Sequence, residues 1–165
     1  MKIVVVSDTH EERAFNQLIH QEKADAYFHA GDSELSYFDS SMEQWIRVKG
    51  NNDLDVNYPE IRIVELAEEK ILVAHGHLLS VYETPDVLKQ KAKEVGATIV
   101  LFGHTHMAGA NQLDDILFVN PGSYSRPRGL PLPSYAIISA FSDDYLVEWK
   151  SPTGELLFSR EFKRE

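Results

Sequence analysis

Five short apolar runs of this chain end in residues that can bind a metal ion, and this pattern constrains the fold more than any other feature. The five motifs, in chain order, are Asp8-Thr9-His10, Gly31-Asp32, Gly50-Asn51-Asn52-Asp53, His75-Gly76-His77 and Gly103-His104-Thr105-His106. The apolar runs are rich in β-branched residues and are typical of buried strands. In an open α/β sheet the carboxyl ends of the strands meet at one crevice. We therefore expect these donors to converge, and they are numerous enough for two divalent metal ions.

Composition places the chain among ordinary globular proteins. Its 165 residues, 43% apolar and 25% charged, predict a single domain over residues 1–165. The absence of cysteine from the sequence excludes disulfides, zinc–thiolate sites and cysteine nucleophiles. The formal net charge of −10 disfavours nonspecific binding to nucleic acid or to anionic membranes. It does not exclude an anionic substrate, because bound metal ions dominate their local field.

The N-terminal apolar run is too short for a secretory signal peptide, because Ser7-Asp8 interrupts it and no small-residue cleavage site follows. No stretch of the sequence approaches the length of a transmembrane helix. We therefore expect a cytoplasmic protein with no nucleic-acid or membrane partner. The sequence leaves a homo-oligomer open.

Hydrophobic periodicity divides the chain into an α/β first half and an all-β second half. Helices are predicted over 11–22 and 85–95. Strands are predicted over 2–7, 26–30, 45–49, 61–66, 70–74, 98–102, 116–119, 135–141, 145–150 and 156–162. The initial strand–helix–strand order indicates a right-handed parallel crossover, and the later strands indicate antiparallel pairing. We predict two sheets packed face to face, with helices on the outer faces.

Each motif taken alone also has an ordinary structural explanation. Asp8 could cap a helix that begins near residue 11, and Gly31-Asp32 and Gly50-Asn51-Asn52-Asp53 could be common turns. A His-x-His pair after a buried strand is more specific, and five of the seven histidines lie in the three histidine-containing motifs. We therefore favour a joint metal site. Of the other two histidines, His20 is expected to face solvent, and His29 to be a buried, hydrogen-bonded residue.

As an ordered set, the motifs resemble those of the calcineurin-like metallophosphoesterase superfamily. The runs Asn120-Pro121-Gly122-Ser123 and Ser125-Arg126-Pro127-Arg128-Gly129 resemble its small bacterial branch, the YfcE-type phosphodiesterases. The resemblance extends from Asp8 to Gly129 by motif and further by strand pattern. It implies an α/β fold, a four-layer α/β/β/α sandwich of two mixed sheets with helices on the outer faces.

The resemblance also implies a set of seven ligands for two divalent metal ions. They are, for the first metal, Asp8, His10 and His106; for the second, Asn51, His75 and His104; and, as a bridge between the two, Asp32. The family suggests manganese, and the ligand types also admit iron, nickel or zinc. The resemblance also implies a small phosphoester substrate: a metal-bound hydroxide would attack a phosphate diester, without any serine or cysteine nucleophile.

One position departs from the family pattern. Many members carry a histidine after the asparagine ligand, where it can protonate the leaving group or bind phosphate, and this chain has Asn52 there. Asparagine cannot act as a general acid, so efficient cleavage of esters with poor leaving groups is in question. His77 could supply the missing acid or could be a pocket-wall residue. Asp53 is expected to support a ligand from behind or to be a turn residue, instead of acting as a catalytic base. Arg126 and Arg128 could bind a substrate phosphate or could be plain loop arginines.

Two other functions stay open on the sequence alone. A phosphomonoesterase or nucleotidase would use the same ligands as a phosphodiesterase. A non-catalytic interaction scaffold on the same fold is disfavoured, because such scaffolds lose ligands and this chain has all seven.

Overall fold

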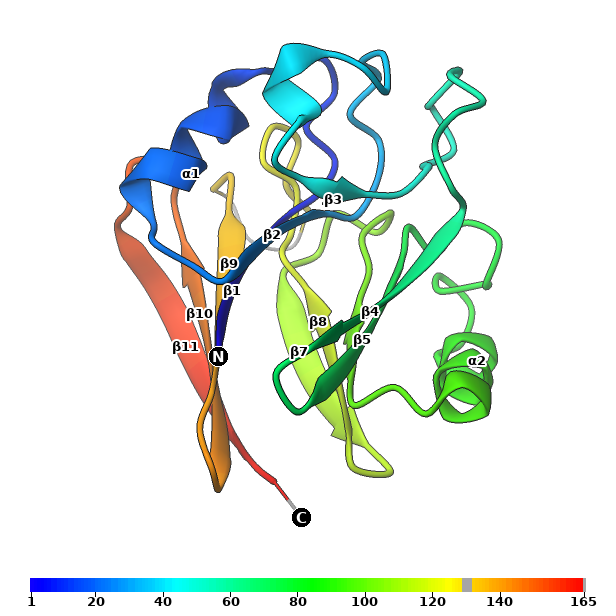
Figure 1. The fold of residues 1–165 in the computed structure, drawn as a ribbon, viewed down its shortest axis with the longest axis vertical. Coiled ribbons are helices and arrows are strands. Elements are labelled where there is room, and N and C mark those ends of the chain that lie inside the picture. The colour runs from blue at the N-terminus through cyan, green and yellow to red at the C-terminus, as the bar shows by residue number, and fades with distance from the viewer. Residues whose placement is uncertain (129–131, 165) are drawn as a thin grey trace.

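The computed structural model describes residues 1–128 and 132–164, which form two facing sheets with helices outside them (Figure 1). Within these residues the first sheet has six strands, in the order β11 (Leu156–Lys163), β10 (Asp144–Lys150), β9 (Tyr135–Ala140), β1 (Lys2–Val6), β2 (Ala26–His29) and β3 (Ile46–Arg47). The second has five, in the order β4 (Ile61–Leu66), β5 (Glu69–Ala74), β6 (Ile99–Leu101), β8 (Ile116–Asn120) and β7 (Gly109–Leu113). Both sheets are mixed, as predicted.

Strand pairing confirms the predicted parallel crossover between β1 and β2, but β8, which was expected among antiparallel strands, pairs in parallel with β6. Strand β1 pairs in parallel with β2, and β2 with β3, while β9 runs antiparallel to β1 on its other side. In the second sheet β4 and β5 form a hairpin, and β5, β6 and β8 are parallel. The strand ends that carry the motifs therefore point to the same rim of the sandwich.

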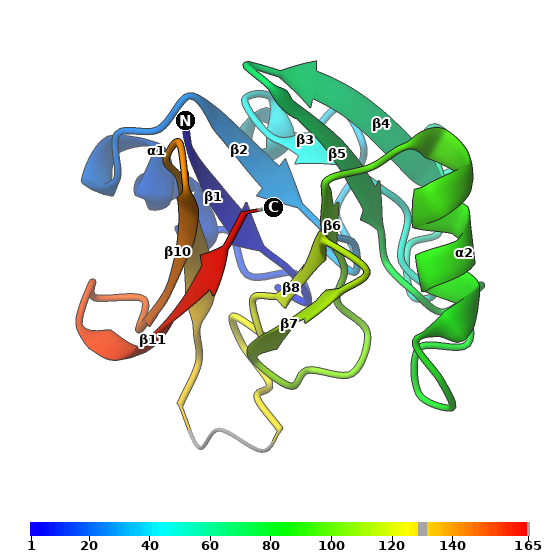
Figure 2. The ribbon, with the colours of Figure 1, turned by 90° about the horizontal axis from the view of Figure 1, so that it is seen from below.

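Three apolar clusters define the layers. The largest lies between the sheets and includes Val5, Val73 and Leu101, one from each of β1, β5 and β6. The alternate residues of β1, such as Val4, face outward onto the segment that contains α1 (Leu18–Gln21). The helix α2 (Asp86–Val95) covers the outer face of the second sheet through Leu88. Figure 2 shows α1 and α2 on opposite outer sides of the two sheets, which confirms the predicted four-layer sandwich.

The helix predicted over 11–22 is wrong in its first part. The chain forms a 3₁₀ turn, η1 (Ala14–Gln17), and then only the single turn of α1. The backbone N–H groups of His10 and Glu11 donate to the carbonyls of Asp32 and Ser33 at 3.0 and 2.8 Å, and Glu11 has a left-handed φ of 69°. Hydrogen bonds to the Gly31-Asp32 motif and the residue after it therefore keep residues 10–13 in a loop. Helical turns form only from Ala14 onward.

Two strand predictions also need correction. Strand β7 was not predicted, because its sequence is polar and it is an edge strand with only Ala110 buried. The strand predicted over 45–49 is reduced to the two paired residues of β3. A second 3₁₀ turn, η2 (Ser40–Met42), precedes it. Among the described residues no helix is both long enough and apolar enough to cross a membrane.

A buried charge joins the two sheets at the end of the sandwich away from the motifs. Glu69, at the start of β5, is 3% exposed and accepts hydrogen bonds from Thr98 and Tyr145 at 2.6 and 2.9 Å. Arg164, just after β11, forms an ion pair with the other carboxylate oxygen at 2.7 Å. Tyr145 lies in β10 and Arg164 follows β11, both strands of the first sheet. Their contacts with Glu69 therefore link the C-terminal strands to the second sheet.

We expect Arg164→Met to lower the free energy of unfolding by about 1–3 kcal/mol, because it leaves a buried carboxylate oxygen without its charged partner. Lys163→Met is the matched control, because Lys163 pairs with Asp144 on the surface, where solvent screening leaves ion pairs with little effect on stability. Urea unfolding of both variants measures the difference. Equal effects would contradict a fastening role for Arg164.

Candidate active site

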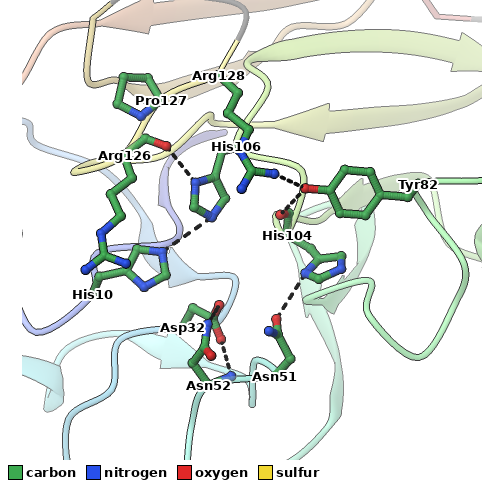
Figure 3. Close-up of a pocket in the computed structure, with 10 residues that line it drawn as sticks. All are labelled: His10, Asp32, Asn51, Asn52, Tyr82, His104, His106, Arg126, Pro127 and Arg128. Atoms are coloured by element: carbon green, nitrogen blue, oxygen red, sulfur yellow. Dashed lines mark hydrogen bonds between the residues drawn. The ribbon is translucent and has the colours of Figure 1, made fainter.

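The seven residues predicted as metal ligands come together at the rim where the strands of both sheets end. Asp8 and His10 follow β1, and Asp32 follows β2. His75 follows β5, and His104 and His106 follow β6. A pocket of about 360 Å³ opens here; its lining residues are His10, Asp32, Asn51, Asn52, Tyr82, His104, His106, Arg126, Pro127 and Arg128 (Figure 3).

The first group of donors is formed by Asp8, His10 and His106, whose ligand atoms lie within 4.8 Å of one another. The Nε2 atoms of the two histidines face each other at 3.3 Å, and His106 Nε2 lies 3.1 Å from Asp8 Oδ1. Asp8 Oδ1 is buried and makes no well-aligned hydrogen bond to any described residue.

The hydrogen bonds behind the first group orient its rings. His106 Nδ1–H donates to the carbonyl of Arg126 at 2.6 Å, which turns the Nε2 lone pair toward Asp8. His10 Nδ1 points toward the Glu34 carboxylate at 3.7 Å, a residue that the sequence did not single out. Two imidazole nitrogens and a carboxylate oxygen thus meet where a cation would satisfy all three.

The second group of donors contains His75, Asp32, Asn51 and His104. His75 Nε2 lies 3.0 Å from Asn51 Oδ1 and 3.4 Å from Asp32 Oδ2, while His104 Nδ1 also lies 3.0 Å from Asn51 Oδ1. His75 Nδ1–H donates to the carbonyl of Ala30 at 2.7 Å, so its Nε2 also presents a lone pair. Asp8 Oδ1, 3.7 Å from His75 Nε2, is the carboxylate oxygen that lies near both groups.

Electrostatics keeps both carboxylates of this rim ionised. Burial alone would raise the pKa of Asp8, but hydrogen bonding and the charges of His106 and His75 lower it below its ordinary value. The pKa of Asp32 is lowered in the same way against burial, by His75 and by the Asn52 amides. Burial would lower the pKa of His75, but Asp32 and Asp8 raise it above its ordinary value, and Asp8 likewise raises the pKa of His106. Ionised carboxylate oxygens beside imidazole nitrogens are suited to binding cations.

Five of the seven residues have a left-handed backbone that L-residues rarely adopt. Their φ angles are 54° for Asp8, 44° for His10, 61° for Asp32, 68° for His104 and 59° for His106. Such conformations cost roughly 1–3 kcal/mol each and persist only where the surrounding structure enforces them. This strain is concentrated at the motifs.

Two glycines allow the strand ends to approach one another. A Cβ on Gly103 would lie 2.0 Å from Ser7 Oγ and 2.6 Å from Asp8 Oδ2, and a Cβ on Gly31 would lie 2.7 Å from the His75 ring. Glycine is therefore required at positions 31 and 103, because any larger residue would overlap the neighbouring strand end.

Asn52 and Asp53 both hold Asp32 through hydrogen bonds. The backbone N–H and the side-chain amide of Asn52 donate to the two Asp32 oxygens at 2.8 and 2.9 Å. Asp53 is buried and accepts backbone N–H bonds from Asp32, Gly50 and Glu34 at 2.9, 2.7 and 2.8 Å. Asp53 thus holds the turn at Gly50 and the backbone of Asp32, in agreement with both expected roles. The Asp32 contacts of Asn52 were not foreseen.

Comparison with known proteins agrees with this geometry. The family model described as the calcineurin-like phosphoesterase superfamily domain matches residues 1–143. The chain belongs to this superfamily. It is 34% identical over 157 residues to the probable metallophosphoesterase YsnB of Bacillus subtilis, an alignment that covers 93% of each protein. Phosphodiesterase MJ0936 of Methanocaldococcus jannaschii is 29% identical over 144 residues, or 74% of this chain and 83% of that protein.

A solved structure shows the same fold closely. The crystal structure of a conserved protein from Streptococcus pneumoniae TIGR4, described as a predicted phosphoesterase, matches with a TM-score of 0.96 at 36% identity. The match covers 99% of this chain and 97% of that one. The predicted membership of the calcineurin-like superfamily is therefore confirmed, and the chain is a member of a hydrolase family that binds divalent metals.

The remaining residues singled out in this calcineurin-like chain have different positions. Arg126 and Arg128 line the pocket. His77 is not among the lining residues; its ring packs 5.5 Å from the His75 ring, and its buried Nδ1 has no hydrogen-bond partner in the described part of the chain. Tyr82 lines the pocket and was missed, because no motif marks it. Gly129 lies outside the described residues.

His29 lies directly behind the ligand-bearing loops, as a buried residue with both ring nitrogens engaged. Its Nδ1 accepts from the Gly31 N–H at 3.1 Å, so its Nε2–H donates to Thr9 Oγ1 at 2.9 Å. Burial lowers the pKa of His29 to about 3. The expectation of a buried, hydrogen-bonded histidine is confirmed, and His20 is exposed as expected.

We expect Gly103→Ala to lower the free energy of unfolding by about 1–3 kcal/mol, because the new Cβ overlaps the Ser7 side chain. Gly109→Ala is the control, because a Cβ there meets no heavy atom within 4 Å, and its effect should stay within about 0.5 kcal/mol. Denaturant unfolding of the two variants tests this. A harmless Gly103→Ala would show that the strand ends can move apart.

His29 should make stability depend on pH. Its pKa is about 3 in the folded state and about 6.5 when unfolded, so acid favours the unfolded chain. Its stabilisation is complete above pH about 6.5 and is lost by up to about 1.4 kcal/mol per unit as the pH falls toward 3. The measurement is denaturant unfolding between pH 4 and 8. His29→Gln should flatten this dependence, while the exposed His20→Gln should follow wild type; parallel curves for all three would contradict the assignment.

Proposed function

We propose that this protein is a dinuclear-metal-dependent phosphodiesterase. The observation that carries the proposal is the buried Asp8 Oδ1, which lacks a well-aligned donor among the described residues and lies near imidazole nitrogens of both donor groups. A buried, ionised oxygen without a donor is costly unless a cation compensates it. The donor set of carboxylate, imidazole and amide oxygen fits manganese, iron, nickel or zinc, and manganese is our first expectation.

The seven residues would divide between two metal ions as the family implies. Asp8, His10 and His106 would hold the first, Asn51, His75 and His104 the second, and Asp32 would join them. Two divalent cations bound here would neutralise phosphate charge and activate a water molecule for attack. The chain's own residues orient the ligands: Ala30 and Arg126 fix the ring tautomers through their carbonyls, and Asn52 and Asp53 hold Asp32.

A phosphate diester is the substrate class that we favour. The pocket of about 360 Å³ admits a small molecule, and Arg126 and Arg128 supply positive charge on its wall. The relative named Phosphodiesterase MJ0936 supports the same reaction. Because the Asn52 amide is engaged by Asp32 and carries no acidic proton, the leaving oxygen receives no proton from this position. The site therefore suits esters whose leaving groups are stable as anions.

The test is a substrate panel on metal-stripped protein with manganese, iron, nickel or zinc added back. We expect aryl phosphodiesters to be cleaved, with the rate falling steeply as the leaving-group pKa rises. Chelation should abolish the activity and metal should restore it. Turnover by metal-free protein would overturn the dinuclear proposal, and absence of turnover with every metal would overturn the proposal of an enzyme.

A phosphomonoesterase is the second candidate function. Two arginines on the pocket wall would also suit the extra charge of a monoester. Faster cleavage of phenyl phosphate than of the matched diester would favour it. A non-catalytic scaffold is disfavoured because all seven ligand positions are present. Five of them form two clusters of mutually close donors, and Asn51 Oδ1 lies 3.0 Å from a ring nitrogen of both His75 and His104.

We expect Asp32→Asn to reduce the bound metal from two ions toward one and to lower turnover by more than about 100-fold. Loss of residues behind a ligand already costs 10–100-fold, so loss of a bridging charge should cost more. Metal analysis and diester turnover measure the two effects. Asp86→Asn, at the exposed start of α2, is the control. A variant that keeps two metals and normal turnover would show that Asp32 is not the bridge.

A further inference from the structure

Tyr82 and Arg128 form a hydrogen-bonded pair on the pocket wall that none of the motifs indicates. Arg128 Nη1 donates to the Tyr82 hydroxyl, and the hydroxyl donates to the carbonyl of His104 at 3.2 Å. Figure 3 shows the Tyr82 hydroxyl pointing toward His104 and Arg128, on the side of the pocket away from His10 and Arg126. The pair joins the segment between β5 and α2 to the segment after β8.

Arg128 is held at both ends by these contacts. Its backbone N–H donates to the carbonyl of His106 at 2.9 Å, and its guanidinium is fixed by Tyr82. In the described part of the chain no carboxylate lies within 4.0 Å of that guanidinium. Within residues 1–128 and 132–164 this guanidinium makes one hydrogen bond, to Tyr82, so four of its five N–H donors have no partner there and can bind an anion. An arginine fixed before binding loses little side-chain entropy when the ligand arrives.

Arg126 provides an internal comparison. It lines the same pocket, and its backbone is tied to Ser123 Oγ and His106 Nδ1 at 2.7 and 2.6 Å. Its guanidinium makes no hydrogen bond to another residue within 1–128 or 132–164. The two arginines thus share a loop and a pocket, and differ in whether a side chain holds the guanidinium.

We propose that Tyr82 is a positioning residue that holds Arg128 ready to bind a non-bridging oxygen of the substrate phosphate. This inference rests on the proposed function, because it takes a phosphoester as the substrate. Tyr82 acts on binding through Arg128, so its contribution requires Arg128 and is independent of Arg126.

Tyr82 also touches His104, and this contact must be separated from the proposed role. The rings lie 4.9 Å apart in an edge-to-face arrangement, in addition to the hydrogen bond to the His104 carbonyl. A variant that only disturbed His104 would lose metal affinity. Tyr82→Phe keeps the ring and removes the hydroxyl, so the edge-to-face contact is retained.

The experiment is a pair of double-mutant cycles with inorganic phosphate as the probe. Calorimetry on the metal-loaded protein measures the dissociation constant of phosphate for Tyr82→Phe, Arg128→Gln, Arg126→Gln and the two doubles that contain Tyr82→Phe. We expect Tyr82→Phe to weaken phosphate binding by about 3- to 10-fold, as expected when one long side chain must be immobilised on binding. With Arg128→Gln already present it should have no further effect, and with Arg126→Gln the effects should multiply.

Two further readouts decide the interpretation. On an aryl phosphodiester, Tyr82→Phe should raise KM by the same factor and change kcat little, and the affinity for the metals should stay at the wild-type value. The proposal is overturned if Tyr82→Phe weakens phosphate binding equally with and without Arg128, or if it lowers metal affinity. If wild type binds phosphate with this coupling but cleaves no ester, the proposed enzymatic function fails while the Tyr82–Arg128 coupling stands.

Discussion

Close contact between the strand ends of the two sheets at Asp8 is the constraint on which the rest of the site depends. The Asp8 carbonyl accepts from Ser123 and Ser125 at 2.8 and 3.1 Å, and its Oδ2 accepts from Ser7 and from the His104 N–H at 2.7 and 3.1 Å. These bonds join the segments after β1, β6 and β8. They satisfy every acceptor of Asp8 except Oδ1, which points among the imidazole rings. The arrangement that closes the sandwich at this rim thus also leaves one buried anionic oxygen for a cation.

The backbone and charges at this rim are locally unfavourable. Left-handed backbone at five ligand positions costs roughly 1–3 kcal/mol per residue, and the same loops hold two carboxylates close together. The cost is met by hydrogen bonds that fix the donors before any metal binds, such as those from His75 to Ala30 and from His106 to Arg126. Metal binding to a prearranged site needs little reorganisation, so the binding free energy adds to the stability of the fold.

Convergence of the ligands was predictable because the motifs follow strands, and parallel strands end at one rim whatever the detailed twist of the sheets. The apolar alternation of β1 and the spacing in α2 likewise predicted the layers. Local pattern failed where a tertiary contact overrode it: residues 11–13 follow the Asp32 turn instead of helical periodicity, and β7 gains its order from β8 alone. Tyr82 could not be predicted, since its partner Arg128 is 46 residues away.

The asparagine at position 52 shows how the site's geometry refines a sequence argument. From sequence, Asn52 appears only as the absence of a proton donor. In the structure its two N–H groups bind both oxygens of Asp32, and Asp53 fixes the same turn through three backbone bonds. A histidine at this position would retain the backbone bond and lose the side-chain amide bond. With asparagine at position 52, the Asp32 carboxylate in the second donor group is held by two hydrogen bonds, and no general acid is present at this position. Proton donation matters least for leaving groups that are already stable anions. If the protein has the function proposed above, asparagine at position 52 would therefore restrict the range of esters cleaved more than it would weaken metal binding.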